Sequence, residues 1–219
     1  MSLQLFAHPF SSYCQKALIA LYENNTAFTF RMLSPEDPAT GQKFAALWPI
    51  KRFPILTDSS RTIVEATTII EYLDHYYPGA VRLIPANAKD AIEVRMMDRV
   101  FDNYISTPQQ RVVFDALRKP EARDAQGVAE ARAMLDTTYA WLDDLMSSRE
   151  WAAGERFSLA DCAAAPALFY ADWTHAIDRK FGNLHAYRSR LLARPSFARA
   201  VDEARVYRPF FPLGAPDRD

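Results

Sequence analysis

The chain has 219 residues, of which 49% are hydrophobic and 24% are charged, a composition typical of a folded globular protein with one large domain or two small ones. The formal net charge is -1 and like charges form no long block, so we expect neither nucleic-acid binding nor attachment to an anionic membrane. Two cysteines are too few for a disulfide scaffold, and no stretch approaches the roughly 20 apolar residues of a membrane span.

The N-terminus leads directly into an apolar segment without a basic region or a long hydrophobic run. We therefore expect no signal peptide and a cytoplasmic location. The four histidines lack the spacing of metal ligands, so no metal is expected. We find no internal repeat and no low-complexity segment.

The first 21 residues predict a strand, a loop and a helix. Residues 3–6 are mostly apolar, Pro9 interrupts them, and beyond Ser12 apolar side chains recur at helical spacing. Ser11 and Ser12 therefore stand where the strand ends and the helix begins, a position that serine favours because its hydroxyl satisfies free backbone N–H groups. A helix N-terminus carries partial positive charge and can hold an anion, including a thiolate.

The next segments complete a small sheet. Residues 27–32 alternate apolar and polar side chains, which predicts a strand with one buried face. Residues 34–41 have the composition of a loop, and 44–48 form a short apolar piece. Residues 55–57 and 62–64 predict two further strands joined by a tight hairpin turn.

Helices account for the rest of the chain. One helix is expected from Glu65 to Tyr77, where Pro78 and Gly79 stop it, so the N-terminal part has the order β-α-β, loop, β-β-α. After a connector at 80–85 only helical periodicity persists. We expect helices at 90–105, 128–146, 159–170, 184–192 and 197–204, followed by an irregular tail from 207.

Ser158-Leu159-Ala160-Asp161 predicts a capping box at the start of the third of these C-terminal helices. The Ser158 side chain can accept hydrogen bonds from the first turn, and the Asp161 carboxylate can accept one from the Ser158 N–H. This helix is apolar on every side, so we expect it to be buried all round.

Five motifs, in order along the chain, resemble those of the cytosolic glutathione S-transferases: SSYC at 11–14, FPIL at 53–56, EAT at 65–67, SLAD at 158–161 and ARPSF at 193–197. The first occupies the place of the thioredoxin-fold Cys-x-x-Cys, with serine where the first cysteine would stand. The resemblance implies an α/β thioredoxin-like domain with a mixed four-stranded sheet over residues 1–79, then an all-helical domain over 86–219. It also implies a serine-type enzyme, theta-like or zeta-like, with a cis peptide bond before Pro54.

The resemblance implies glutathione as co-substrate, and its thiol must be ionised near neutral pH. Ser11 matches the activating serine of theta-like and zeta-like enzymes, and Ser12 is the alternative hydroxyl. A hydroxyl that donates to a thiolate contributes roughly 1.5–3 kcal/mol, and a helix N-terminus adds about 0.3–1 kcal/mol. Together they lower a thiol pKa by about two units.

The same resemblance assigns the binding of the tripeptide. Phe53, before Pro54, would exchange backbone hydrogen bonds with the cysteinyl unit, and Arg52 or Lys51 would pair with the glycyl carboxylate. The family's usual Asn-Pro-x-Gly-Lys is replaced by Trp48-Pro49-Ile50-Lys51-Arg52.

The γ-glutamyl end would be met by Glu65 and by the backbone N–H of Ala66, although the hydroxyl that the family usually carries at Ala66 is missing. Thr67 is the nearest residue that offers one. We expect the electrophile pocket between the domains, with candidate walls at Phe10, Tyr104, Trp173, Phe210 and Phe211.

The leading hypothesis is a transferase that conjugates glutathione to small hydrophobic electrophiles and pairs as a homodimer through residues 66–77 and 89–105. Glutathione-dependent isomerisation, dehalogenation or peroxide reduction on the same fold stays open. The departures at Ala66 and at 48–52 also favour a second class, a non-catalytic module that binds a partner protein or hydrophobic ligands.

Overall fold

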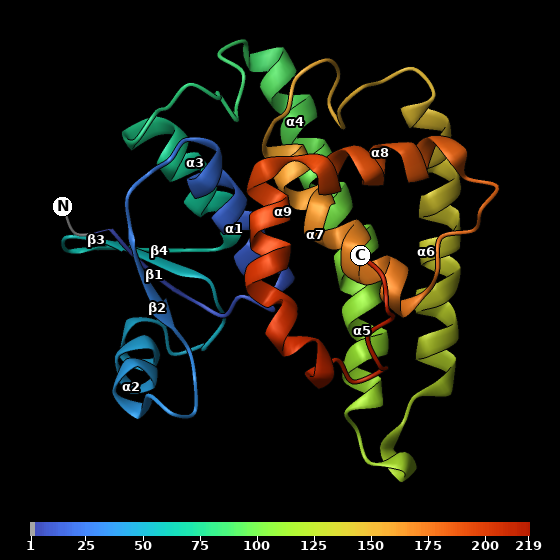
Figure 1. The fold of residues 1–219 in the computed structure, drawn as a ribbon, viewed down its shortest axis with the longest axis horizontal. Coiled ribbons are helices and arrows are strands. Elements are labelled where there is room, and N and C mark those ends of the chain that lie inside the picture. Colours follow the sequence, from blue (N-terminus) through green and yellow to red (C-terminus); the bar gives the residue numbers. More distant parts are fainter. Residues whose placement is uncertain (1–2) are drawn as a thin grey trace.

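The computed structural model describes residues 3–219. Figure 1 shows a part built of the sheet and its own helices, which lies beside a larger group of helices. The four strands run in the spatial order β2-β1-β3-β4, with β1 parallel to β2 and antiparallel to β3, and β3 antiparallel to β4. They are β1 (Gln4–Ala7), β2 (Thr29–Met32), β3 (Ile55–Asp58) and β4 (Arg61–Val64).

Alternation along the strands places helices on both faces of the sheet. Leu5 and Leu56 belong to the main core together with buried side chains of the first and third helices, whereas Phe6 and Ile55 pack with Phe44 of the second helix. Successive side chains of a strand point to opposite faces, so this division follows from the sequence. The three helices are α1 (Ser12–Glu23), α2 (Pro38–Leu47) and α3 (Ala66–Tyr76).

The remainder of the chain is helical, as the sequence predicts. Helix α1 packs against α3 on the sheet and against α7 and α9 of the helical part, so it lies at the seam between the two (Figure 1). The helices are α4 (Ala88–Val100), a π-helical turn (Phe101–Ser106), α5 (Thr107–Ala116), α6 (Ala125–Met146), α7 (Leu159–Thr174), α8 (Gly182–Ala193) and α9 (Pro195–Ala204), with short 3₁₀ turns at Pro120–Ala122 and Arg205–Phe210.

Two helices differ from the expectation. Residues 34–41 are not wholly a loop, because α2 begins at Pro38, whose fixed backbone suits the first helical position, and the Asp37 side chain accepts a hydrogen bond from the Thr40 N–H at 3.0 Å. The helix expected to end at residue 105 instead continues through a π-helical turn into α5.

The π-helical turn has a local cause at Pro108, which has no N–H to continue the ordinary hydrogen-bond ladder. The hydroxyl of Thr107 donates to the carbonyl oxygen of Asp102 at 2.9 Å and bridges the irregular turn. This turn carries Asp102 and Asn103 to the wall of the site described below.

The capping box at the start of α7 is confirmed, with the Ser158 N–H donating to Asp161 Oδ2 at 2.9 Å. The other oxygen of Asp161 accepts from the Ala152 N–H at 2.9 Å and from the Tyr187 hydroxyl at 2.7 Å. One carboxylate thus ties the start of α7 to the preceding loop and to α8. Across residues 3–219, no helix has the length and apolarity to cross a membrane.

Candidate functional site

A cleft of about 610 Å³ opens where the sheet domain meets the helical part. The N-terminus of α1, the loop before β3 and the start of α3 form one side, and the π-helical turn, α5 and the C-terminal segment form the other. Residues from both halves of the chain therefore build it. The cleft is lined by most of the residues predicted for the site: Phe10, Ser11, Ser12, Arg52, Phe53, Pro54, Glu65, Ala66 and Phe210.

Ser11 is the N-cap of α1, and Ser12 is the first residue of the helix. Ser11 Oγ accepts a hydrogen bond from the Cys14 N–H at 3.4 Å. The same hydroxyl also contacts the Cys14 thiol, and because a hydroxyl hydrogen can rotate, it can donate to a ligand in the cleft instead. The cleft therefore has, at the positive end of α1, a hydroxyl group able to donate to an anion.

Cys14 belongs to the core rather than to the cleft. Its side chain is fully buried, and burial raises the pKa of the thiol to about 12, although hydrogen bonds from Ser11 and from the His8 N–H act the other way. The thiol is therefore protonated near neutral pH. His8 has a local role too, because its Nδ1 accepts from the Phe10 N–H at 3.2 Å.

The loop before β3 brings three predicted residues to the cleft. The Phe53–Pro54 peptide bond is cis, as expected, and Phe53, next to Arg52 in the sequence, is 41% exposed. Lys51, which adopts a left-handed backbone conformation with φ of 56°, lines the same stretch. The loop thus brings the cis peptide bond and two cationic residues to the lining of the cleft.

Glu65 and Ala66 stand at the start of α3. Glu65 is the N-cap residue and has φ of 68°, a conformation that costs energy for a residue other than glycine and that is often found at functional sites. Its side chain is exposed and makes no capping hydrogen bond, while Ala66 is buried. The first turn of α3 therefore keeps free backbone N–H groups beside a carboxylate.

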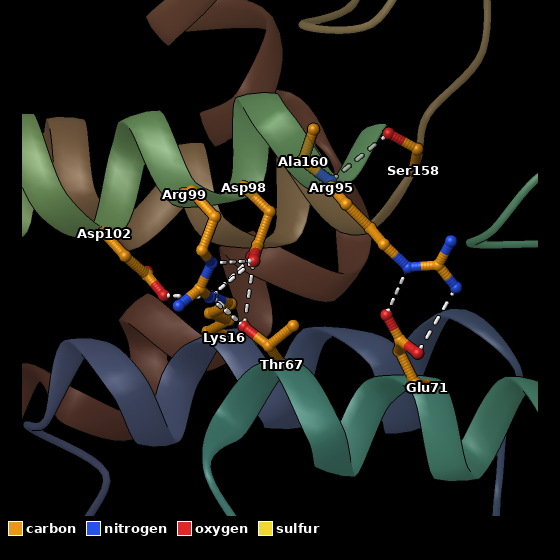
Figure 2. Close-up of polar contacts among 9 residues, drawn as sticks. All are labelled: Lys16, Thr67, Glu71, Arg95, Asp98, Arg99, Asp102, Ser158 and Ala160. Atoms are coloured by element: carbon orange, nitrogen blue, oxygen red, sulfur yellow. Dashed lines mark hydrogen bonds and ion pairs between the residues drawn. The ribbon is translucent and has the colours of Figure 1, made fainter. Parts of the chain in front are cut away.

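Thr67 is not among the residues that line the cleft, because its hydroxyl is engaged in a buried polar network (Figure 2). It accepts from Lys16 Nζ at 3.0 Å and donates to Asp98 Oδ2 at 2.9 Å. Lys16 in α1 is only 1% exposed and also pairs with Asp98 at 2.5 Å and with Asp102 at 2.8 Å. These bonds join α1 and α3 to α4 and the π-helical turn.

Sequence reasoning missed this network for a physical reason. The sequence alone assigns no role to Lys16, because a lysine in a helix usually faces solvent; here α1 is surrounded and residues 14–21 are all buried. The signal that identifies its partners is the pair Asp98 and Asp102, two carboxylates four residues apart on one helical face. Only the fold brings that pair to Lys16.

An aromatic wall closes the side of the cleft nearest the C-terminal segment. Phe10 meets Tyr170 edge-to-face with ring centroids 5.5 Å apart, and Phe211 lies 6.4 Å from Phe10. Phe210, 75% exposed, adds to the rim, and Val113 and Phe114 of α5 line the cleft as well. Val113 and Phe114 were not predicted because α5 itself was not expected, and Tyr170, in the expected helix at 159–170, was not predicted as a wall residue.

Two predicted wall residues lie elsewhere in the structure. Tyr104 is not among the residues that line the cleft, and it is 48% exposed. Trp173 is buried behind the wall, 5.4 Å from Phe211 and 5.6 Å from Tyr170 between ring centroids, and therefore supports the wall without lining the cleft.

The cleft lining also contains polar side chains, among them Tyr13, Arg99, Asn103 and Gln110. Burial raises the pKa of Tyr13 to about 12, so its hydroxyl keeps its proton at neutral pH. The cleft can therefore accept a ligand that has both apolar and hydrogen-bonding groups. No group of three or more His, Cys, Asp or Glu side chains within residues 3–219 is arranged to hold a metal ion.

Family comparisons cover most of the chain. Residues 5–80 match the family model for the glutathione S-transferase N-terminal domain, and residues 109–195 match the model for the glutathione S-transferase C-terminal domain. The two matches together span both sides of the cleft.

Individual relatives agree with this result. A probable maleylacetoacetate isomerase of Vibrio cholerae is 27% identical over 213 residues, covering 93% of this chain and 97% of that protein. Glutathione S-transferase F7 of Arabidopsis thaliana is 23% identical over 173 residues, covering 77% and 83%. A crystal structure of a glutathione S-transferase from Methylobacterium radiotolerans in complex with glutathione sulfonate superposes with a TM-score of 0.79 at 26% identity, covering 92% and 95% of the two chains.

Proposed function

The chain belongs to the glutathione S-transferase superfamily, and from this premise we propose that it binds glutathione in the cleft and activates the thiol for attack on a small hydrophobic electrophile. The observation that carries the proposal is the hydroxyl of Ser11 at the N-terminus of α1, inside a cleft with an aromatic wall. A thiolate needs a hydrogen-bond donor and a positive potential, and an apolar electrophile needs the wall.

We propose that the tripeptide spans the sheet side of the cleft. The cysteinyl backbone pairs with Phe53, the glycyl carboxylate meets Arg52, and the γ-glutamyl end lies at Glu65 and Ala66. This places the sulfur at Ser11, with Ser12 as the alternative donor. The cationic loop and the free N–H groups of α3 support the two carboxylate positions.

In the proposed reaction, the thiol loses its proton to solvent and the sulfur lone pair forms a bond to an electrophilic carbon. A leaving group then departs with its bonding electrons. The hydroxyl of Ser11 stabilises the thiolate before the attack and acts through a hydrogen bond, without accepting the proton. The electrophile rests against Phe10 and Phe211.

A second candidate is a glutathione-dependent cis–trans isomerase. It is favoured by the likeness to the probable maleylacetoacetate isomerase of Vibrio cholerae over nearly the whole of both chains. The same thiolate would add to a carbon–carbon double bond, allow rotation and leave again, so that no group is lost. The polar side chains of the cleft support an unsaturated substrate that carries hydrogen-bonding groups.

Binding and turnover separate these functions. Isothermal titration with glutathione measures binding, and assays with an aryl halide and with a cis-unsaturated dicarboxylate measure conjugation and isomerisation. Binding together with one of the two activities supports an enzyme and identifies its reaction. Binding without any turnover favours the non-catalytic module, and absence of binding contradicts the proposal.

We further propose that the enzyme works as a two-fold homodimer in the cytoplasm, with residues 1–79 as the glutathione-binding domain and 86–219 as the helical domain. Tyr76 of α3 and Ile92 and Met96 of α4 support the dimer, because they are apolar and more than half exposed on the two helices expected to pair.

A further inference from the structure

Arg99 of α4 lines the cleft although it comes from the helical part of the chain. Its guanidinium lies between α4 and the start of α3, as Figure 2 shows. The Nε group donates to Asp98 Oδ2 at 2.9 Å, and Nη2 donates to Asp102 Oδ2 at 2.6 Å and also to the hydroxyl of Thr67. These contacts fix the position of the guanidinium beside the first turn of α3.

The Nη1 group of this guanidinium is available to a ligand. Within residues 3–219, no hydrogen bond or ion pair of Arg99 involves Nη1, and the side chain is 49% exposed. Arginine carries five N–H donors, so two of them are free for a ligand. A guanidinium held in place by its other nitrogen atoms loses little freedom when it binds a carboxylate.

The charge balance explains why Arg99 holds its position. Lys16 and Arg99 supply two positive charges, and Asp98 and Asp102 supply two negative ones, so the four side chains are neutral together. Lys16, Asp98 and Asp102 are each buried by at least nine-tenths. The three buried side chains therefore hold the half-exposed Arg99 in a fixed position.

The groups around Arg99 match an α-amino-acid head. Glu65 is exposed and lines the same cleft, and one oxygen of Asp102, Oδ1, is buried without a hydrogen-bond partner among the described residues. A free cationic edge beside carboxylates suits a ligand that carries a carboxylate and an ammonium on neighbouring atoms. In glutathione only the γ-glutamyl end has both.

We propose that Arg99 binds the α-carboxylate of the γ-glutamyl residue of glutathione, and so completes the tripeptide site from the helical domain of the same chain. The inference rests on the proposed function. It assigns to Arg99 the contact that the side chain of Ala66 is unable to make, because alanine has no hydroxyl and the hydroxyl of Thr67 is already engaged. Glutathione would then join the two halves of the chain.

The test pairs two ligands with three proteins. The ligands are glutathione and 4-aminobutyryl-cysteinyl-glycine, which lacks only the α-carboxylate of the γ-glutamyl residue. The proteins are the wild type, Arg99→Met and Arg95→Met. Arg95 is a matched control because it lies one turn earlier on α4, is 47% exposed and pairs with Glu71, outside the cleft lining (Figure 2).

We expect the wild type and Arg95→Met to bind glutathione about 10- to 100-fold more tightly than the analogue, as measured by titration calorimetry, because one charge-assisted contact is lost. Arg99→Met should bring the two affinities close together, leaving only the part of the preference that the backbone N–H groups at the start of α3 supply. A general loss of structure would weaken the binding of both ligands equally and leave the ratio of their dissociation constants unchanged. A change in this ratio therefore reports the contact between Arg99 and the carboxylate.

Arg99→Met leaves the buried carboxylates with one negative charge in excess, so Arg99→Lys serves as a second variant. It retains the charge but not the planar fork, and we expect an intermediate ratio. If folded Arg99→Met or Arg99→Lys shows the same ratio of dissociation constants as the wild type, the proposal is overturned and the proposed function stands. Failure of the wild type to bind glutathione overturns both.

Discussion

The hydroxyl that activates the thiol can be identified by replacing Ser11 and Ser12 one at a time. Ser11→Ala removes one charge-assisted hydrogen bond, worth roughly 1.5–3 kcal/mol. One pKa unit corresponds to about 1.4 kcal/mol, so we expect the thiol pKa of bound glutathione to rise by about one to two units. The partial charge of the α1 N-terminus stays in both variants and keeps the pKa below that of free glutathione.

The structure also gives the cost of each substitution to the fold. Ser11 caps α1 through the Cys14 N–H, so its removal should reduce the free energy of unfolding by about 0.5–2 kcal/mol. Ser12 is the first residue of α1 and not its N-cap, so Ser12→Ala serves as the matched control for stability. The affinity for glutathione should change little in either variant, because most of the proposed contacts lie at Phe53, Glu65 and the Ala66 backbone.

The ultraviolet absorbance of the thiolate, followed against pH in each binary complex, measures this pKa directly. The pH profile of turnover should move upward with it. A titration that shifts in Ser12→Ala and not in Ser11→Ala would assign the role to the other hydroxyl. If neither variant shifts it, the reasoning from the serine hydroxyls is refuted and the helix terminus acts alone.

Three further predictions concern the fold and its assembly. Ser158→Ala should lower the free energy of unfolding in urea by about 1 kcal/mol or more through loss of the cap of α7, without changing glutathione affinity; equal stability would contradict the capping role. Sedimentation at micromolar concentration should show a species of twice 24.9 kDa, and a monomer alone would remove the dimer. Hydroxyl groups of Tyr77 and Tyr72 donate to Asp58 and hold the pKa of that carboxyl below its usual range, so this stabilisation is present above about pH 4 and is lost as the pH falls through the folded-state pKa. The free energy of unfolding of Asp58→Asn should therefore fall less steeply than that of the wild type as the pH is lowered. Urea melts at several pH values measure this dependence, and the same dependence in both proteins would refute the linkage.

Local signals predicted much of this architecture. The strand at 27–32, the hairpin after β3 and the capping box of α7 each depend on neighbours within a few residues, and the structure contains all three. The strand lacks the buried face that was predicted, since Phe30 is only partly buried and Met32 is 38% exposed. The cis bond before Pro54 was expected from the family motif and is present. The order of elements along the chain followed from such features.

The errors arose where long-range contacts override a local signal. Pro108 marks an end of the ordinary helical ladder, yet the chain continues into α5 because α5 packs against α6 and α7. For this reason the wall residues Val113 and Phe114 were missed. Lys16 has the character of a surface residue, and only its partners more than eighty residues later explain its burial.

The central claim is that glutathione binds in this cleft with its sulfur at the N-terminus of α1. A crystal structure of the complex tests that claim most directly. The account predicts the sulfur within hydrogen-bonding distance of Ser11 Oγ and the cysteinyl backbone paired with Phe53. A tripeptide bound elsewhere, or one whose sulfur points away from both Ser11 and Ser12, would contradict it.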